Sequence, residues 1–309
     1  MAKLSVLIPA GGVPGGSGER FLPQTVNDLL TKAAGDVQVV VTLDGYKPNP
    51  PLPDDPRLVQ IFHATPRGMR ASINDAAAVA NGEFLMKCDA HCMFQEGYDE
   101  ILKADCAENW IVIPARYSLD AENWAIQRNG KPRRDYHYLC YPEPDKDHDG
   151  GMHGVEWWSR GKERADPQYD IDDNMSFQGS CWFMPRAWFW DFLGGMSEVG
   201  YGGFTQEPQE IGLKTWLGGG AIKVNKKVCY AHLHKGRTYG RMYHQDRAEV
   251  VRGHNYSADY WMNNRWEKRI HDIEWLIDKF SPVPTWPENW KEIEPERRER
   301  AKRRLEDAH

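Results

Sequence analysis

The sequence predicts an α/β fold: a doubly wound, mixed sheet followed by a helical C-terminal extension. Short apolar runs alternate with amphipathic helical patterns through the first ninety residues, which implies parallel strands joined by helical crossovers. The runs are continuous in apolar character, as in strands covered on both faces. From about residue 241 the pattern changes to polar and aromatic helical segments interrupted by prolines.

The elements follow in order along the chain. Strands are expected at residues 3–10, 37–43, 58–62 and 83–87, and helices at 19–34 and 70–80, where apolar positions recur at helical spacing. Residues 116–175 are polar and weakly periodic, and we expect a long excursion there. An apolar segment (176–185), a short helix (187–193), a helix (208–217) and a strand (221–230) come next. We place the domain boundary at residue 240, with 1–240 as the α/β domain and 241–309 as the helical extension.

Composition and charge argue against three classes of protein: those that coat nucleic acid, metal-finger proteins and membrane-spanning proteins. The net charge of −6 does not suggest a protein that coats nucleic acid. Residues 297–304 hold six basic residues and one acid, which is either a solvated helix face or a binding patch. The six cysteines show no metal-finger spacing, and there is no targeting signal or membrane-length apolar run. We therefore expect a cytoplasmic protein.

The sequence Asp89-Ala90-His91 follows the strand predicted at 83–87. An acid and a histidine two residues apart project the same way, because strand side chains repeat with period two. Ligands bind at the carboxyl ends of strands in open α/β sheets, and a carboxylate with an imidazole suits manganese. The alternative is an aspartate that caps the next turn, beside a surface histidine.

Residues 83–92 (EFLMKCDAHC) resemble the metal-binding strand of the polypeptide N-acetylgalactosaminyltransferases and related family 2 glycosyltransferases. The resemblance covers roughly residues 3–235. It implies a GT-A (Rossmann-like) fold and sugar transfer from a nucleotide sugar, with a UDP-sugar as the expected donor and Mn²⁺ or Mg²⁺ as the expected cation. The Glu207-x-x-Glu210 and Trp216-x-Gly-Gly-Gly signatures place the third metal ligand at His232. His234 is the near alternative, so the predicted metal ligands are Asp89, His91 and His232.

The resemblance also implies the donor site. Donor contacts are expected from Pro9, Asp44, Arg67, Gly68, Arg70 and Asp89, with Tyr239 and Arg241 closing over the diphosphate. Asp44 ends the second strand, where these enzymes place a carboxylate for the nucleotide, and residues 67–70 resemble the segment that approaches the diphosphate and sugar.

Glu207 and Glu210 are the candidate catalytic residues. They share a helix face, and an acid near the sugar could deprotonate an acceptor hydroxyl. The alternative is a pair of acids stabilised at a helix N-terminus, with Pro208 in the first turn. The family's Gly-Gly-Glu-Asn motif is stretched here across residues 202–207.

Two other functions remain open. Residues 8–12 and 18–23 are reminiscent of sugar-nucleotide pyrophosphorylases, whose glycine-rich loop cradles a triphosphate. The second alternative is a protein with a GT-A scaffold that binds a glycan or nucleic acid without catalysing a reaction. If the chain is an enzyme, its acceptor is a protein, a saccharide, another hydroxylated compound or a hydroxymethylated DNA base. Trp157 and Trp158 are candidate platforms on which the acceptor could stack. Residues 241–309 are expected to overhang the face where the sugar is transferred.

Overall fold

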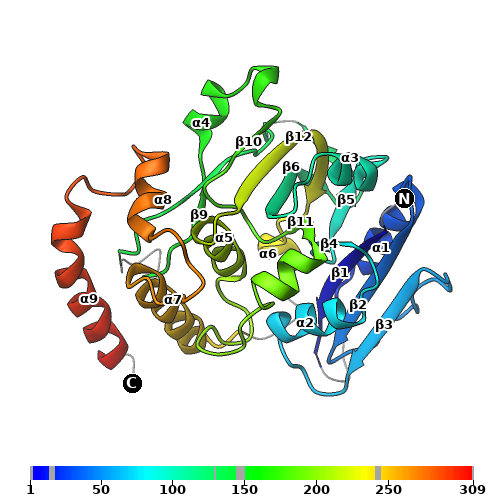
Figure 1. Cartoon of the computed structure of the whole chain (residues 1–309). Helices are drawn as coiled ribbons and strands as arrows, with labels where there is room; N and C mark the ends of the chain where they lie inside the picture. The colour runs from blue at the N-terminus through cyan, green and yellow to red at the C-terminus, as the bar shows by residue number, and fades with distance from the viewer. Residues whose placement is uncertain (1–2, 14–17, 129, 144–149, 241–244, 308–309) are drawn as a thin grey trace.

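The computed structural model describes residues 3–13, 18–128, 130–143, 150–240 and 245–307 (Figure 1). The predicted donor residue Arg241 lies outside these ranges. Within them, no helix combines the length and apolar character needed to cross a lipid bilayer.

The sheet is mixed and ten-stranded, in the order β10-β12-β6-β11-β4-β1-β2-β3, with β5 and β7 beside β12 and β6. The strands are β1 (Leu4–Gly11), β2 (Val37–Asp44), β3 (Leu58–His63), β4 (Phe84–Cys88), β5 (Cys92–Phe94), β6 (Trp110–Asp120), β7 (Ala125–Gln127), β10 (Ile171–Asp173), β11 (Cys181–Pro185) and β12 (Ala221–His232). Strands β8 (His137–Leu139) and β9 (Gly154–Glu156) form a separate hairpin-like pair.

Strands β1 to β4 run parallel, and β11 runs against both β4 and β6. Strand β6 therefore has the direction of β4, and β12 pairs with β6 in parallel. The carboxyl ends of β1, β2, β4, β6 and β12 consequently meet at one edge. This topology brings the end of β4 close to the end of β12, more than a hundred residues later.

The helices cover both faces of the sheet, as the continuous apolar strands predict. They are α1 (Leu22–Lys32), α2 (Met69–Val79), α3 (Tyr98–Ala104), α4 (Trp158–Glu163), α5 (Glu207–Leu217), α6 (Gly236–Tyr239), α7 (Arg247–Met262), α8 (Ile273–Phe280) and α9 (Trp290–Asp307), with short helices η1 (Pro167–Tyr169) and η2 (Trp188–Phe192). Val6 and Val39 pack with α1, whereas Leu7 and Val40 pack with α2 on the opposite face. The alternation of side chains along each strand explains the two cores.

The C-terminal extension is helical, as predicted, and α9 lies far from β3 (Figure 1). Its Trp261, Leu276 and Trp290 are buried in the same hydrophobic cluster as Leu7 and Val40 of the sheet. The extension therefore shares a core with the preceding residues, and the domain boundary at residue 240 stays a prediction.

Several elements differ from the expected ones. Strand β6, in the middle of the sheet, was not predicted. No element was expected at residues 110–115, and residues 116–120 were assigned to the long polar excursion. The helix expected at 187–193 is a five-residue π-helix, η2. The excursion itself contains β7 to β10 and α4. Strand β12 runs two residues further than expected and ends on His232, because its last residues pair with β5.

Candidate metal centre and its surroundings

Asp89, His91 and His232 converge at the carboxyl edge of the sheet. Asp89 and His91 follow β4, and His232 is the last residue of β12. The Nε2 atom of His232 lies 3.1 Å from Oδ2 of Asp89 and 3.1 Å from Nε2 of His91. The backbone ties the two segments together, since Leu233 N–H donates to the His91 carbonyl at 3.1 Å. Their ligand atoms all lie within 4.8 Å of one another.

This donor set fits a divalent cation. Both histidines are buried, and among the described residues His232 Nδ1 has no hydrogen-bond partner, while His91 Nδ1 faces Glu19 Oε2 at 3.4 Å. Both Nε2 atoms face the Asp89 carboxylate, at 3.1 Å for His232 and 3.9 Å for His91. Burial lowers the pKa of His232 to about 3, against the opposing effect of Asp89, so its imidazole is neutral. Neutral imidazoles with a carboxylate are ligands that manganese accepts.

The structure favours His232 over His234 as the third member. The His234 ring lies 5.0 Å from that of His232 and is exposed, outside the convergent group. Period-two alternation puts both rings on one side, but the last pairing of β12 with β5 is at His232, so the strand ends before His234.

Lys87 holds the second oxygen of Asp89. This lysine is 1% exposed on β4, and its Nζ lies 2.8 Å from Asp89 Oδ1, 3.1 Å from Glu207 Oε2 and 2.6 Å from the Gly179 carbonyl. Burial alone would raise the pKa of Asp89, but Lys87 and the histidines reverse the effect and hold that pKa well below its usual range. Asp89 is therefore a carboxylate with Oδ2 turned toward the histidines.

Glu207 and Glu210, the predicted catalytic acids, are both occupied by protein partners. Glu207 accepts from Trp182 Nε1 at 2.6 Å and from Lys87, and burial raises its pKa. Glu210 pairs with Arg70 and Lys214 and accepts from the Ser197 N–H at 3.0 Å. These contacts favour positioning roles for both glutamates in place of the predicted catalytic ones.

Arg70 is buried in the same network. Besides Glu210, its guanidinium donates to the carbonyls of Ser197 at 2.6 Å and Thr205 at 2.7 Å, and it lies 4.3 Å from the centre of the Tyr201 ring. A side chain that is 1% exposed and bonded in this way anchors the loop before α5. The contacts favour this anchoring role over the predicted contact with a donor phosphate.

Asp44 organises the loop after β3. Its Oδ1 accepts from the Arg67 N–H at 2.8 Å and lies 2.7 Å from His63 Nδ1, and its Oδ2 accepts from the Gly68 N–H at 2.9 Å. Gly68 has a φ of +89°, and a Cβ there would meet the Gly203 carbonyl oxygen at 2.8 Å. Asp44, Arg67 and Gly68 thus form one unit at the edge of the sheet.

Two further predicted donor residues, Pro9 and Tyr239, lie within the described ranges. Pro9 is half-buried on β1, paired with Thr42. Tyr239, at the end of α6, packs edge-on against Phe21 with ring centres 5.4 Å apart, and its hydroxyl bonds to Glu122 at 2.9 Å. Neither contact of Tyr239 involves Asp89, His91 or His232.

Glu19 is not among the predicted site residues, although it lies in residues 18–23, the segment that is reminiscent of sugar-nucleotide pyrophosphorylases. Its Oε2 lies 3.4 Å from His91 Nδ1, and its Oε1 accepts from Lys235 Nζ at 2.6 Å. Beside it is a hollow of about 250 Å³ lined by Glu19, Arg20, Phe21, Lys235, Thr238, Tyr239 and Gly240. Glu19 contacts His91 and Lys235, which lie far from it in the sequence, so no local sequence pattern indicated that Glu19 belongs to the site.

A second group missed by the sequence reading lies on β6. The register puts Ser118 beside His232, and Arg134 donates to the Ser118 hydroxyl at 3.0 Å. Arg116, two residues before Ser118, is 3% exposed and bonds to Gln178 and Glu156. The alternation of Arg116 and Ser118 at the end of an apolar run was the available signal.

The two candidate acceptor-binding residues, Trp157 and Trp158, differ in solvent exposure. Trp157 is buried in the core, packed edge-on against Tyr138, whereas Trp158 is 44% exposed with the Arg134 guanidinium 5.9 Å from its ring centre. Trp158 therefore has the exposure that a platform needs, and Trp157 does not.

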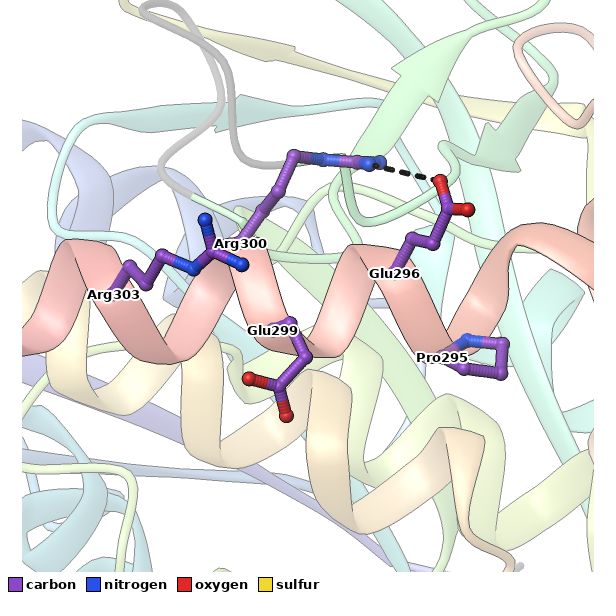
Figure 2. Close-up of a pocket in the computed structure, with 5 residues that line it drawn as sticks. All are labelled: Pro295, Glu296, Glu299, Arg300 and Arg303. Atoms are coloured by element: carbon purple, nitrogen blue, oxygen red, sulfur yellow. Dashed lines mark ion pairs between the residues drawn. The ribbon is translucent and has the colours of Figure 1, made fainter.

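Three arginines of the basic run near the C-terminus, Arg297, Arg298 and Arg300, are paired with glutamates. Arg297 is 2% exposed and bonds to Glu294, and Arg300 pairs with Glu143. A hollow of about 420 Å³ lies on α9, lined by Pro295, Glu296, Glu299, Arg300 and Arg303. Figure 2 shows that these side chains come from one helix and include the Arg300–Glu296 ion pair. The hollow is a surface between side chains of one helix, away from the triad.

Comparisons with known proteins agree with this architecture. A family model described as glycosyl transferase family 2 matches residues 5–193. The structure of GalNAc-T7 with UDP, GalNAc and Mn2+ matches with a TM-score of 0.61 and 14% identity, covering 95% of this chain and 54% of that one. TarS from S. aureus in complex with UDP-GlcNAc matches with a TM-score of 0.53 and 15% identity, covering 86% and 68%. The chain spans about half the length of GalNAc-T7, and at these identities the likeness shows the fold.

Proposed function

Because the chain belongs to glycosyl transferase family 2 and has the GT-A fold, we propose that it transfers a sugar from a UDP-sugar to an acceptor hydroxyl. The transfer depends on a divalent cation, preferably Mn²⁺, held by Asp89, His91 and His232. The observation that carries the proposal is the convergence of one carboxylate oxygen and two imidazole Nε2 atoms at the carboxyl edge of the sheet.

A cation bound there would neutralise charge that develops on the leaving diphosphate. The protein's own contribution is positioning. Lys87 binds one oxygen of Asp89, and this leaves the other oxygen directed toward the histidines. Glu207 balances the charge of Lys87, and Glu210 with Arg70 holds the loop before α5. Asp44 fixes Arg67 and Gly68 at the same edge, where we propose that the nucleotide binds with Pro9 and Tyr239 nearby.

The choice of UDP rests on two structural relatives, which are complexes with UDP and with UDP-GlcNAc. The cation proposed here is supported by the Mn2+ in the first of them and by the nitrogen and oxygen donor set of this chain.

For the acceptor we propose a hydroxyl compound that reaches the edge beside Trp158. Proteins and saccharides fit this better than hydroxymethylated DNA. Binding DNA requires unpaired cations for its phosphates, and the arginines at 297 and 300 are paired with glutamates. A cytoplasmic location stays part of the proposal, in keeping with six free thiols.

The test is release of UDP from a panel of UDP-sugars, with and without Mn²⁺, in the wild type and in Asp89→Asn. We expect metal-dependent release that the variant loses. Release by neither protein, together with no metal-dependent rise in melting temperature, would support a scaffold that binds without catalysis. A pyrophosphorylase would instead release pyrophosphate from UTP and a sugar 1-phosphate.

A further inference from the structure

Glu19 lies beside the metal triad without belonging to it. It follows Gly18 in the loop before α1 and is 8% exposed. One carboxylate oxygen lies 3.4 Å from Nδ1 of His91, and the other accepts from Lys235 at 2.6 Å. A buried carboxylate with one cationic partner has its second oxygen available for the imidazole.

The orientation of the His91 ring relates the Glu19 contact to metal binding, because the two ring nitrogens face opposite sides. Its Nε2 lies 3.1 Å from Nε2 of His232 and 3.9 Å from Oδ2 of Asp89, so Nε2 faces the position of the cation. The opposite nitrogen, Nδ1, faces Glu19. A neutral imidazole carries its proton on one nitrogen, and a carboxylate next to Nδ1 favours the proton there. The lone pair is then on Nε2, where a metal needs it.

Glu19 is not itself placed as a ligand. The group whose ligand atoms converge consists of Asp89, His91 and His232 among the described residues. The Glu19 carboxylate sits behind the His91 ring, on the side of Nδ1. Its contact with Lys235, three residues after His232, ties the loop after β1 to the segment that follows β12.

We propose that Glu19 is a positioning residue that accepts the Nδ1 proton of His91 and thereby directs the Nε2 lone pair to the cation. The inference rests on the proposed metal site and adds a residue that acts through His91. Carboxylates behind metal-binding histidines typically change metal affinity by about 10- to 100-fold when removed.

The experiment compares Glu19→Ala and Glu19→Gln with Glu122→Ala, by titrating the full chain with Mn²⁺ and recording electron paramagnetic resonance. Glu122 is a matched control, because its carboxylate bonds Tyr239 near the same hollow but is exposed. We expect about 10- to 100-fold weaker binding for Glu19→Ala, a smaller loss for Glu19→Gln, and unchanged binding for Glu122→Ala. Melting temperatures show whether each variant is folded.

A second readout reports the tautomer directly. In ¹⁵N-histidine-labelled, metal-free protein, long-range ¹H–¹⁵N spectra should place the His91 proton on Nδ1 in the wild type. Glu19→Gln, which keeps the size of the side chain if Glu19→Ala does not fold, should lower that fraction. An unchanged tautomer together with unchanged Mn²⁺ affinity in Glu19→Gln would overturn the proposal for Glu19. If Asp89→Asn also binds Mn²⁺ like the wild type, the metal site itself is wrong.

Discussion

The Lys87 ammonium lies 3.1 Å from Glu207 Oε2 and 2.8 Å from Asp89 Oδ1, so one buried cation joins two carboxylates of the site. The two carboxylates lie just after β4 and at the start of α5, and Lys87 is the cation that both of them contact. Removing Lys87 would leave both carboxylates without this cation, and breaking a buried ion pair in this way costs about 3–5 kcal/mol.

The first prediction follows from this relationship. Lys87→Met should lower the free energy of unfolding by about 3–5 kcal/mol, because Glu207 and Asp89 lose their shared cation. The double variant Lys87→Met/Glu207→Gln removes one of the stranded charges and should recover much of that loss. Denaturant unfolding measures both. A single variant as stable as the wild type would show that Lys87 does not stabilise the pair.

The second prediction concerns the three metal residues. Asp89→Asn, His91→Ala and His232→Ala should each abolish Mn²⁺-dependent UDP release with little change in melting temperature, because all three lie at strand ends. His234→Ala is the control and should retain activity, since His234 lies outside the convergent group. The reverse result for His232 and His234 would place the third ligand two residues later.

The third prediction concerns the loop at Gly68. Gly68→Ala should weaken UDP binding and lower stability, because the residue has a φ of +89° and its new Cβ would lie 2.8 Å from the Gly203 carbonyl oxygen. Gly130→Ala is a matched control, with a φ of +69° and no atom within 4 Å of the added Cβ. Left-handed helical backbone costs about 1–2 kcal/mol for alanine. Gly68, with φ of +89° and ψ of 168°, lies outside that region, so its excess loss reports this backbone and the clash together. Calorimetric titration with UDP and thermal unfolding compare the two, and equal losses would argue against the clash.

The fourth prediction is a pH dependence at His254. Burial lowers the pKa of His254 to about 4, with His153 adding to the shift. In the unfolded chain the group titrates near 6.5, so on acidification the unfolded state takes up a proton before the folded state. His254 should therefore reduce stability as pH falls from about 6.5 to about 4, by at most about 1.4 kcal/mol per pH unit.

His254→Gln should make the decline shallower in that window and leave the stability curve above pH 7 parallel to that of the wild type. Urea unfolding at a series of pH values measures this. Parallel curves throughout the acid range would mean that His254 titrates alike in the folded and unfolded chain.

The fifth prediction separates two arginines of the basic run. Arg297→Ala should destabilise the protein by about 3–5 kcal/mol, since Glu294 is left buried without its main cation. Arg303→Ala changes an exposed residue of the same helix and should have an effect within about 0.5 kcal/mol. Thermal unfolding distinguishes them, and similar small effects would show that the run is a solvated face throughout.

Strands β1 to β4 and the first two residues of the candidate metal group could be predicted from the sequence, because both are local patterns. Continuous apolar runs mark strands covered on both faces, and Asp89 and His91 are two positions apart at the end of one such run. The third residue, His232, came from the spacing of motifs in a resembling family, and the structure brings it beside the other two.

Burial and pairing were decided by the tertiary structure. Glu207 and Glu210 have the spacing of acids on one helix face, but their partners Lys87 and Arg70 lie 120 and 140 positions away in the chain. No local pattern shows whether such a carboxylate faces a substrate or a buried cation, since this depends on which strand and helix pack together. The same reason hid Glu19, whereas the apolar run at residues 110–115 was a local signal for β6 that was missed. The sequence by itself determined strands β1 to β4, most of β12 and the residue types at their ends. The order of strands in the sheet decided which of those groups meet, because hydrogen-bonded neighbours in a sheet need not be neighbours in the chain.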